Sequence, residues 1–266
     1  MNYENEVKNR IRRKEVVLMA FLDSHDVRNA EILARAGVDI LAINLEQNAF
    51  AESEIVSIAK AVRDAGCCTL ARTSSKDAAL LSHYMDLGVD GILATSCAGA
   101  EEARLVIDAV KYPPLGQRGL SQLSPAMDYG FPMEGVRLEE RLARMNENSM
   151  VFVTLETERA LLEAGDVAAL EQVDSVQIGP TDLAVSMGCA GDLKAERVVS
   201  LMRNANAAIL AAGNRAGDFL PAPTADKLAE LTGRGVYILL IGSDTSLLRQ
   251  GALAFGQAKK LFTQGE

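Results

Sequence analysis

The sequence predicts a single (β/α)8 barrel, and three features of the chain lead to this prediction. Eight short strand-like segments occur along it, and most are continuous apolar runs, as buried parallel strands are. Amphipathic, helix-like segments lie between these strands. With 266 residues, 48% of them hydrophobic, the chain is long and apolar enough to close one barrel around a buried core.

The predicted strands alternate with helices in a regular order. A helix over 26–36 has its apolar residues on one face and ends at Gly37, and the segments 99–110, 195–212 and 244–262 follow the same pattern. A doubly wound open sheet is the alternative fold, but no glycine-rich turn follows the first strand and no change in composition divides the chain. We therefore assign residues 1–266 to one domain. The strands are predicted at residues 16–22, 39–45, 67–72, 91–95, 150–156, 174–178, 215–220 and 236–241.

One insertion interrupts this rhythm between the fourth and fifth strands. Residues 111–149 contain four of the seven prolines and begin rigidly at Pro113-Pro114. A long loop at the C-terminal end of a barrel more often has a function than not. We expect this insertion to lie at that end. A contact between subunits is the alternative role.

Composition excludes several classes of function. The balance of Lys+Arg 27 and Asp+Glu 36 gives a net charge of -9, and no basic run is long enough to follow a phosphate backbone, so we expect no nucleic-acid binding. No apolar stretch approaches the roughly 18 residues of a membrane span, and no apolar signal core precedes the first strand. The cysteines form no Cys-x-x-Cys pair. We expect four reduced thiols and a cytoplasmic protein.

Two carboxylates follow consecutive strands of the predicted barrel. Glu156 ends the fifth strand and the sixth runs into Asp182, so both can reach one point at the barrel mouth. Carboxylates together with water and substrate oxygens form a hard site suited to Mg²⁺ or Mn²⁺. A solvated glutamate and a helix-capping aspartate would leave the same pattern, and spacing alone keeps both interpretations open.

Arg72 ends the third predicted strand. An arginine whose head emerges from a buried strand usually meets an anion, either a carboxylate side chain or a substrate carboxylate. The turn at residues 179–181 opens a helix, and its free N–H groups can bind a carboxylate. The residues by themselves thus indicate an acidic barrel with a divalent-metal site for a small anion.

These segments resemble the HpcH/HpaI aldolase family, the class II, metal-dependent aldolases acting on 2-keto acids such as 4-hydroxy-2-oxoheptanedioate and 2-dehydro-3-deoxyglucarate. The likeness extends from about residue 12 to residue 258. It rests on AGVDILAINLE at 36–46, KYPPLGQRG at 111–119, LET at 155–157 and IGPTDLAVSMG at 178–188. The resemblance implies a (β/α)8 barrel whose C-terminal helix packs on a neighbouring subunit, in a homo-oligomer that is a hexamer or trimer of dimers.

The resemblance also implies roles for particular residues. Glu156 and Asp182 match the metal ligands, for Mg²⁺, Mn²⁺ or Co²⁺, and Arg72 matches the arginine that holds the keto oxygen and the developing enolate. Asp86 matches an acidic residue lent to the neighbouring active site. Binding of the 2-keto acid, a pyruvate-like or oxaloacetate-like molecule, is assigned to Arg72 together with Thr154, Gly179, Pro180 and Thr181.

The sequence departs from the family pattern on the second strand. The family has Asp, two residues, then a His used in proton transfer, whereas this chain has Asn44 and Gln47. Gln47 therefore occupies a catalytic position, but an amide is no base near neutral pH. The replacement for the histidine remains open. The alternatives are His25 in the loop after the first strand, water, and Asp86 from a neighbouring subunit.

The resemblance implies a metal-dependent carbon–carbon lyase that cleaves a 2-keto acid through a pyruvate enolate and releases an aldehyde. The altered dyad leaves two alternatives. One is an oxaloacetate decarboxylase or an enolate-condensing relative, neither of which requires a hydroxyl to be deprotonated. The other is a homologue that binds a keto acid without turnover.

Overall fold

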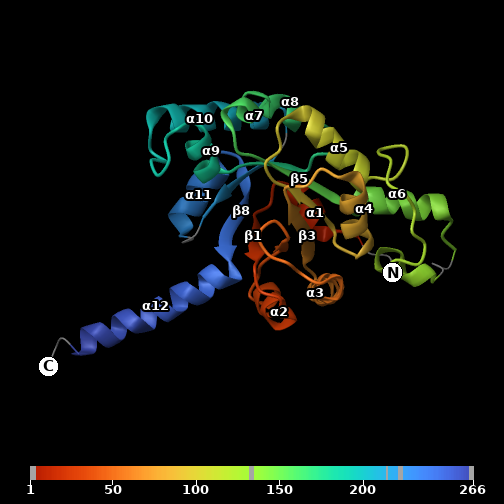
Figure 1. Cartoon of the computed structure of the whole chain (residues 1–266), viewed down its shortest axis with the longest axis horizontal. Coiled ribbons are helices and arrows are strands. Elements are labelled where there is room, and N and C mark those ends of the chain that lie inside the picture. Colours follow the sequence, from red (N-terminus) through yellow and green to blue (C-terminus); the bar gives the residue numbers. More distant parts are fainter. Residues whose placement is uncertain (1–3, 132–134, 214, 221–223, 264–266) are drawn as a thin grey trace.

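Eight parallel strands close into a barrel in chain order (Figure 1). The computed structural model describes residues 4–131, 135–213, 215–220 and 224–263, and the side chains only as far as residue 259. The predicted barrel is confirmed, because β8 pairs with β1 and leaves no open edge. Each strand lies within two residues of its predicted bounds: β1 Val17–Leu22, β2 Ile40–Asn44, β3 Cys68–Thr73, β4 Gly91–Ala94, β5 Met150–Leu155, β6 Ser175–Ile178, β7 Ala216–Phe219 and β8 Val236–Ser243.

Helices surround the barrel, and the four predicted ones are confirmed. They are α2 Val27–Arg35, α5 Ala100–Val110, α10 Glu196–Ala211 and α12 Asp244–Thr263. Local chemistry sets their ends, as at α2, where the Asp26 side chain accepts a hydrogen bond from the backbone N–H of Arg28. The other helical segments are α1 Glu6–Arg12, α3 Glu52–Asp64, α4 Ala78–Asp86, the 3-10 helix η1 Pro125–Gly130, α6 Leu138–Asn148, α7 Glu158–Leu162, α8 Ala164–Ala168, α9 Pro180–Ser186 and α11 Ala225–Gly233.

Side chains along each strand alternate between two apolar cores. One core lies between the sheet and the helices, where Ile43, Val151 and Val153 are fully buried. The other fills the barrel interior with Met19, Ile40, Leu70, Phe152 and other strand residues. Because successive side chains point to opposite faces of a strand, the inward set is fixed at every second residue. This alternation decides which side chains reach the barrel mouth.

The helix α1 closes the bottom of the barrel, where the strands begin. Its Val7 and Ile11 belong to the interior core, and Asn5 Nδ2 donates to the backbone oxygen of Asn148 at 2.9 Å. Asn5 also caps the helix by accepting from the N–H of Lys8. The open end of the barrel is therefore the opposite one, where the strands end.

The insertion at 111–149 lies at the bottom of the barrel, so the expectation that it lies at the C-terminal end of the barrel is wrong. Helix α5 runs between β4 and the insertion, and it returns the chain to the end where strands begin. Pro125 of the insertion accordingly lies beside Gly88, which shortly precedes β4. In a barrel of this class the bottom face contributes stability rather than chemistry.

Buried Lys111 anchors the insertion to the barrel. Its ammonium group donates to the backbone oxygens of Asn146 and Ser149 at 2.7 Å and to Ser149 Oγ at 2.9 Å. Nearby, Lys8 pairs with Asp174 at 3.0 Å. Burial, and then the charge of Lys8, lower the pKa of Lys111 to about 7.

The C-terminal helix α12 leaves the barrel and extends into solvent (Figure 1). Among its described side chains, the large apolar residues Leu248, Leu253 and Phe255 are exposed, the last at 81%. An exposed apolar surface that is contiguous typically marks a site of contact with another molecule. Within the part of the chain that the structure describes, no helix is long and apolar enough to cross a membrane. The four cysteines are free thiols.

The free energy of unfolding should rise with pH from about 7 towards 10.5 because of Lys111. In this window the unfolded chain holds a proton that folded Lys111 has released, so raising the pH favours the folded state. Lys111→Met should flatten the rise measured by urea unfolding at several pH values. The control Lys60→Met alters an exposed lysine and should keep the rise of the free energy of unfolding with pH. An unchanged slope in Lys111→Met would contradict this prediction.

Candidate active site

A layer of polar side chains closes the apolar interior at the mouth of the barrel. The inward positions of β1 pass from Met19 to Phe21 and end at Asp23, and those of β2 end at Asn44. The same alternation takes β3 to Arg72 and β5 through Phe152 to Glu156. The strand ends therefore bring acidic, amide and guanidinium groups to one place.

Arg72 is held on three sides. Its Nη1 lies 2.6 Å from Asn44 Oδ1 and 2.7 Å from Glu46 Oε2, and its guanidinium carbon lies 4.7 Å from the centre of the Phe21 ring. The side chain is only 11% exposed. Such a charged pair combined with ring stacking fixes the orientation of a guanidinium.

The Glu156 carboxylate is fixed by the loop after β4. Its Oε2 accepts hydrogen bonds from the backbone N–H of Ser96 at 3.0 Å and from Ser96 Oγ at 2.7 Å. Ser96 has a φ of 51°, a left-handed conformation that is uncommon outside glycine. Opposite it, Gly179 leaves room for Glu156, because a Cβ on Gly179 would lie 2.6 Å from Glu156 Cγ.

The electrostatics of Glu156 fit a cation. Burial is the largest cause that raises the pKa of this carboxyl, and the charges of Asp182 and Glu46 raise it further. A divalent cation held by Glu156 and Asp182 would remove the repulsion between them. No cluster of three or more His, Cys, Asp or Glu side chains suited to a metal occurs among the described residues.

The segment that carries Asp182 forms the mouth beside β6. Gly179 is the N-cap of α9, Pro180 begins the helix, and Thr181 and Asp182 are exposed in its first turn. Thr154 lies on the inward side of β5, two residues before Glu156, and is 8% exposed. The structure therefore places these predicted residues around Glu156.

Apart from Glu46 Oε2, which lies 2.7 Å from Arg72 Nη1 as an ion pair, three buried polar atoms at the mouth have no hydrogen-bond partner among the described residues: Arg72 Nε, Thr95 Oγ1 and Gln177 Nε2. They come from β3, the end of β4 and β6, all at inward positions. Buried donors normally find an acceptor, so this set fits a ligand rich in oxygen atoms. Sequence reasoning missed Thr95, Ser96 and Gln177, and their position at the strand ends was the signal for them.

Asn44 and Gln47 lie together but form no acid–base pair. Asn44 Nδ2 is 3.3 Å from Gln47 Oε1 and 2.7 Å from Asp23 Oδ1. His25 is turned to the rim, where its Nδ1 lies 3.1 Å from Glu54 Oε2. Its ring stacks on Phe50 with centroids 4.3 Å apart. Its polar partner Glu54 is thus on α3 and not among the groups around Arg72.

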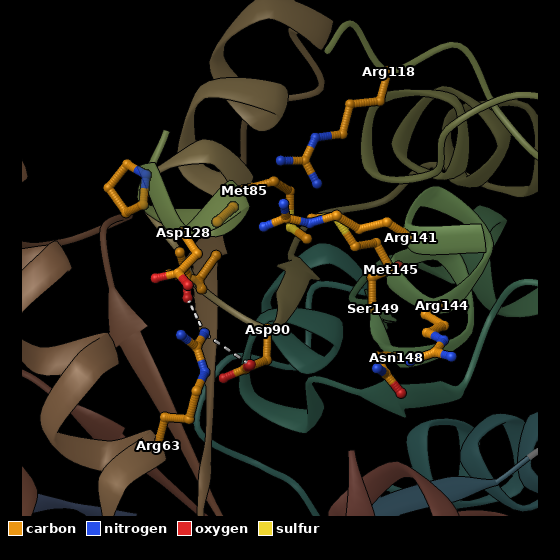
Figure 2. Close-up of a pocket in the computed structure, with 14 residues that line it drawn as sticks. Arg63, Met85, Asp90, Arg118, Asp128, Arg141, Arg144, Met145, Asn148 and Ser149 are labelled. Carbon is orange, nitrogen blue, oxygen red and sulfur yellow. Dashed lines mark hydrogen bonds and ion pairs between the residues drawn. The ribbon is translucent and has the colours of Figure 1, made fainter. Parts of the chain in front are cut away.

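Asp86 lies at the other end of the barrel from Arg72. It ends α4, which runs from the mouth back to the start of β4, and its Oδ1 lies 2.5 Å from Nη2 of buried Arg118. Arg118 points into a cavity of about 170 Å³, in which Arg63 pairs with Asp90 (Figure 2). Asp86 can therefore not serve the mouth of its own barrel.

The chain is similar along nearly its whole length to known aldolases. A hydroxypyruvate/pyruvate aldolase of Delftia acidovorans is 30% identical, over 94% of this chain and 90% of the relative. A 4-hydroxy-2-oxo-heptane-1,7-dioate aldolase of Salmonella paratyphi C is 31% identical over 88% of both chains. The crystal structure of an HpcH/HpaI aldolase from Desulfitobacterium hafniense superposes with a TM-score of 0.86 at 25% identity, covering 95% of this chain and 96% of that one.

A closed parallel barrel with its polar layer at the strand ends defines a (β/α)8 enzyme. The particular family follows from the sequence match. Residues 17–251 match the HpcH/HpaI aldolase/citrate lyase family, and this chain belongs to it. The resemblance inferred from the sequence motifs is confirmed.

Gly179→Ala should weaken binding of a divalent cation by about tenfold or more, the scale seen when a residue supporting a metal ligand is lost. The new Cβ would displace Glu156, whose Cγ and Oε1 lie within 2.8 Å of its position. Titration calorimetry with Mn²⁺ measures the affinity. Gly233→Ala, where a Cβ meets nothing within 4 Å, is the control. Equal affinities for the two variants would show that Glu156 does not bind the cation.

Proposed function

We propose that this protein is a divalent-metal-dependent carbon–carbon lyase that acts on a 2-keto acid through a pyruvate enolate. The observation that supports this most strongly is at the mouth of the barrel, where the charges of Asp182 and of Glu46, the ion-pair partner of Arg72, both act on the buried Glu156 carboxylate. Membership of the aldolase/citrate lyase family agrees with it. The proposed substrate is pyruvate-like or oxaloacetate-like, and an aldehyde is the second product of aldol cleavage.

Arg72 is the proposed anchor for the keto oxygen. Its Nη1 is committed to Asn44 and Glu46, while its buried Nε has no partner within the described part of the chain. Negative charge grows on the keto oxygen as the neighbouring carbon–carbon bond breaks. A fixed guanidinium donor stabilises that charge more in the transition state than in the bound substrate.

Glu156 and Asp182 are the proposed ligands of Mg²⁺, Mn²⁺ or Co²⁺, all of which accept carboxylate oxygens. The bound ion would supply a Lewis acid for the keto acid. Ser96 holds Glu156 by two hydrogen bonds, so the carboxylate is oriented before any ligand arrives. The donors left over, Thr95 Oγ1 and Gln177 Nε2, suit the remaining substrate oxygens.

Decarboxylation of oxaloacetate is a second candidate reaction, and the amides at positions 44 and 47 favour it. Aldol cleavage needs a base for the hydroxyl proton, whereas neither Asn44 nor Gln47 can accept one near neutral pH. In decarboxylation carbon dioxide leaves without any such step. The same enolate forms, so the demands on Arg72 are equal.

We also propose that the active enzyme is a homo-oligomer in which α12 packs on a neighbouring subunit and Asp86 reaches the neighbour's mouth. The exposed Leu248, Leu253 and Phe255 on α12 support the first part. The distance of Asp86 from its own mouth, at the far end of α4, supports the second. A hexamer, or trimer of dimers, is the proposed state.

The purified protein should decarboxylate oxaloacetate when Mn²⁺ is added, and a chelator should abolish the turnover. This reaction tests Arg72 and the carboxylate pair without requiring the missing histidine. Pyruvate release, followed by a coupled reduction assay, measures it, with free Mn²⁺ as the background control. If bound Mn²⁺ gives no turnover above that background, the protein binds keto acids rather than cleaving them.

Glu156→Gln should lower the metal-dependent turnover by more than about 100-fold, the scale of losing a main electrostatic stabiliser. The amide keeps the shape of the carboxyl group but removes its charge, so the fold should persist. Circular dichroism checks the fold and the same assay gives kcat. The exposed neighbour Glu158 provides the control Glu158→Gln. Unchanged kcat in Glu156→Gln would remove Glu156 from the site.

A further inference from the structure

We propose that Asp23 is a positioning residue for Arg72 and acts through the amide of Asn44. Resting on the proposed function, this inference assigns the carboxylate that orients the site to β1 rather than to β2. The three groups form a continuous chain at the mouth, from Asp23 Oδ1 to Asn44 Nδ2 at 2.7 Å and from Asn44 Oδ1 to Arg72 Nη1 at 2.6 Å.

Both oxygens of Asp23 are engaged. Oδ1 accepts from Asn44, and Oδ2 accepts from Thr245 Oγ1 at 2.7 Å. Thr245 belongs to the first turn of α12 and meets Asp23 because β8 closes the barrel against β1. The backbone N–H of Asp23 donates to Asp244 Oδ1 at 2.8 Å. The carboxylate is thus held in place from both neighbouring sides, by β2 and by the start of α12.

The Asp23 charge fixes which way the Asn44 amide points. A carboxylate accepts hydrogen bonds and a guanidinium donates them. With its NH₂ towards Asp23, Asn44 turns its oxygen towards Arg72. The reversed amide would place its oxygen against the Asp23 carboxylate and its NH₂ against the Arg72 guanidinium. Asn44 is 3% exposed, so solvent cannot easily compensate a reversed amide. Asp23 therefore determines the acceptor that Arg72 meets.

Only one of the positions 23 and 44 can carry a carboxylate. An aspartate at 44 would face the Asp23 oxygen across 2.7 Å, and two carboxylates this close share a proton instead of both ionising. In the structure as it stands, burial opposes ionisation of Asp23, but hydrogen bonds from Asn44 and Thr245 outweigh it and leave the pKa lowered. Asn44 is accordingly the partner of a carboxylate placed one strand away.

A charge-exchange cycle tests this inference, with oxaloacetate and Mn²⁺ as probes. Asp23→Asn and Asn44→Asp should each lower kcat about 10- to 100-fold, because Arg72 is misaligned when charge develops, and change KM less than threefold. The double variant D23N/N44D restores one carboxylate and one amide and should recover to within about threefold of the wild type. Asp26→Asn, an exposed aspartate of the same loop paired with Arg28, is the matched control.

Thermal unfolding of the metal-free proteins gives a readout independent of activity. Asn44→Asp should lower Tm by about 2 °C or more, because the two facing carboxylates repel each other in the folded state, and D23N/N44D should return it. If the wild type turns over oxaloacetate but the effects of Asp23→Asn and Asn44→Asp on kcat and on Tm simply add in D23N/N44D, this inference is overturned and the proposed function stands. Absence of turnover in the wild type overturns the proposed function, and with it the need to hold Arg72.

Discussion

The alternation of side chains in a closed parallel barrel is the constraint on which the rest of the structure depends. Each strand sends every second side chain inward, and the apolar layers that fill the interior, from Met19 to Phe152, end in a polar layer at the mouth. A shift of one residue in β3 would turn Arg72 outward into the helices, and the same shift in β5 would turn Glu156 outward. Packing and chemistry are therefore fixed by the same register.

Within the polar layer, charge is arranged around Arg72. Asn44 and Glu46 hold one edge of its guanidinium and the Phe21 ring covers a face, while Nε remains without a partner among the described residues. Glu156 is held by a separate set of hydrogen bonds, from the backbone N–H and the hydroxyl of Ser96. A cation site and a cationic side chain can thus stand close together, because each has its own fixed acceptor or donor set.

The two ends of the barrel have different tasks. At the bottom, α1 and the insertion close the interior, and the buried Lys8 and Lys111 join them through backbone oxygens of residues 146–149. Asp86 also lies there, paired with Arg118. The mouth is not closed by these segments and is built from short strand ends and loops. This division agrees with the general pattern for barrels of this kind.

The sequence by itself determined the barrel, the strand bounds to within two residues, and the placing of Arg72, Thr154 and Glu156 at the ends of strands, because apolar periodicity is a local property. It misplaced the insertion, because helix α5 returns the chain to the bottom of the barrel before the insertion begins. The pairs Asp23–Asn44, Asp23–Thr245 and Ser96–Glu156 join residues 21, 222 and 60 positions apart. Only barrel closure and strand register bring such residues together, and no local pattern encodes those distances.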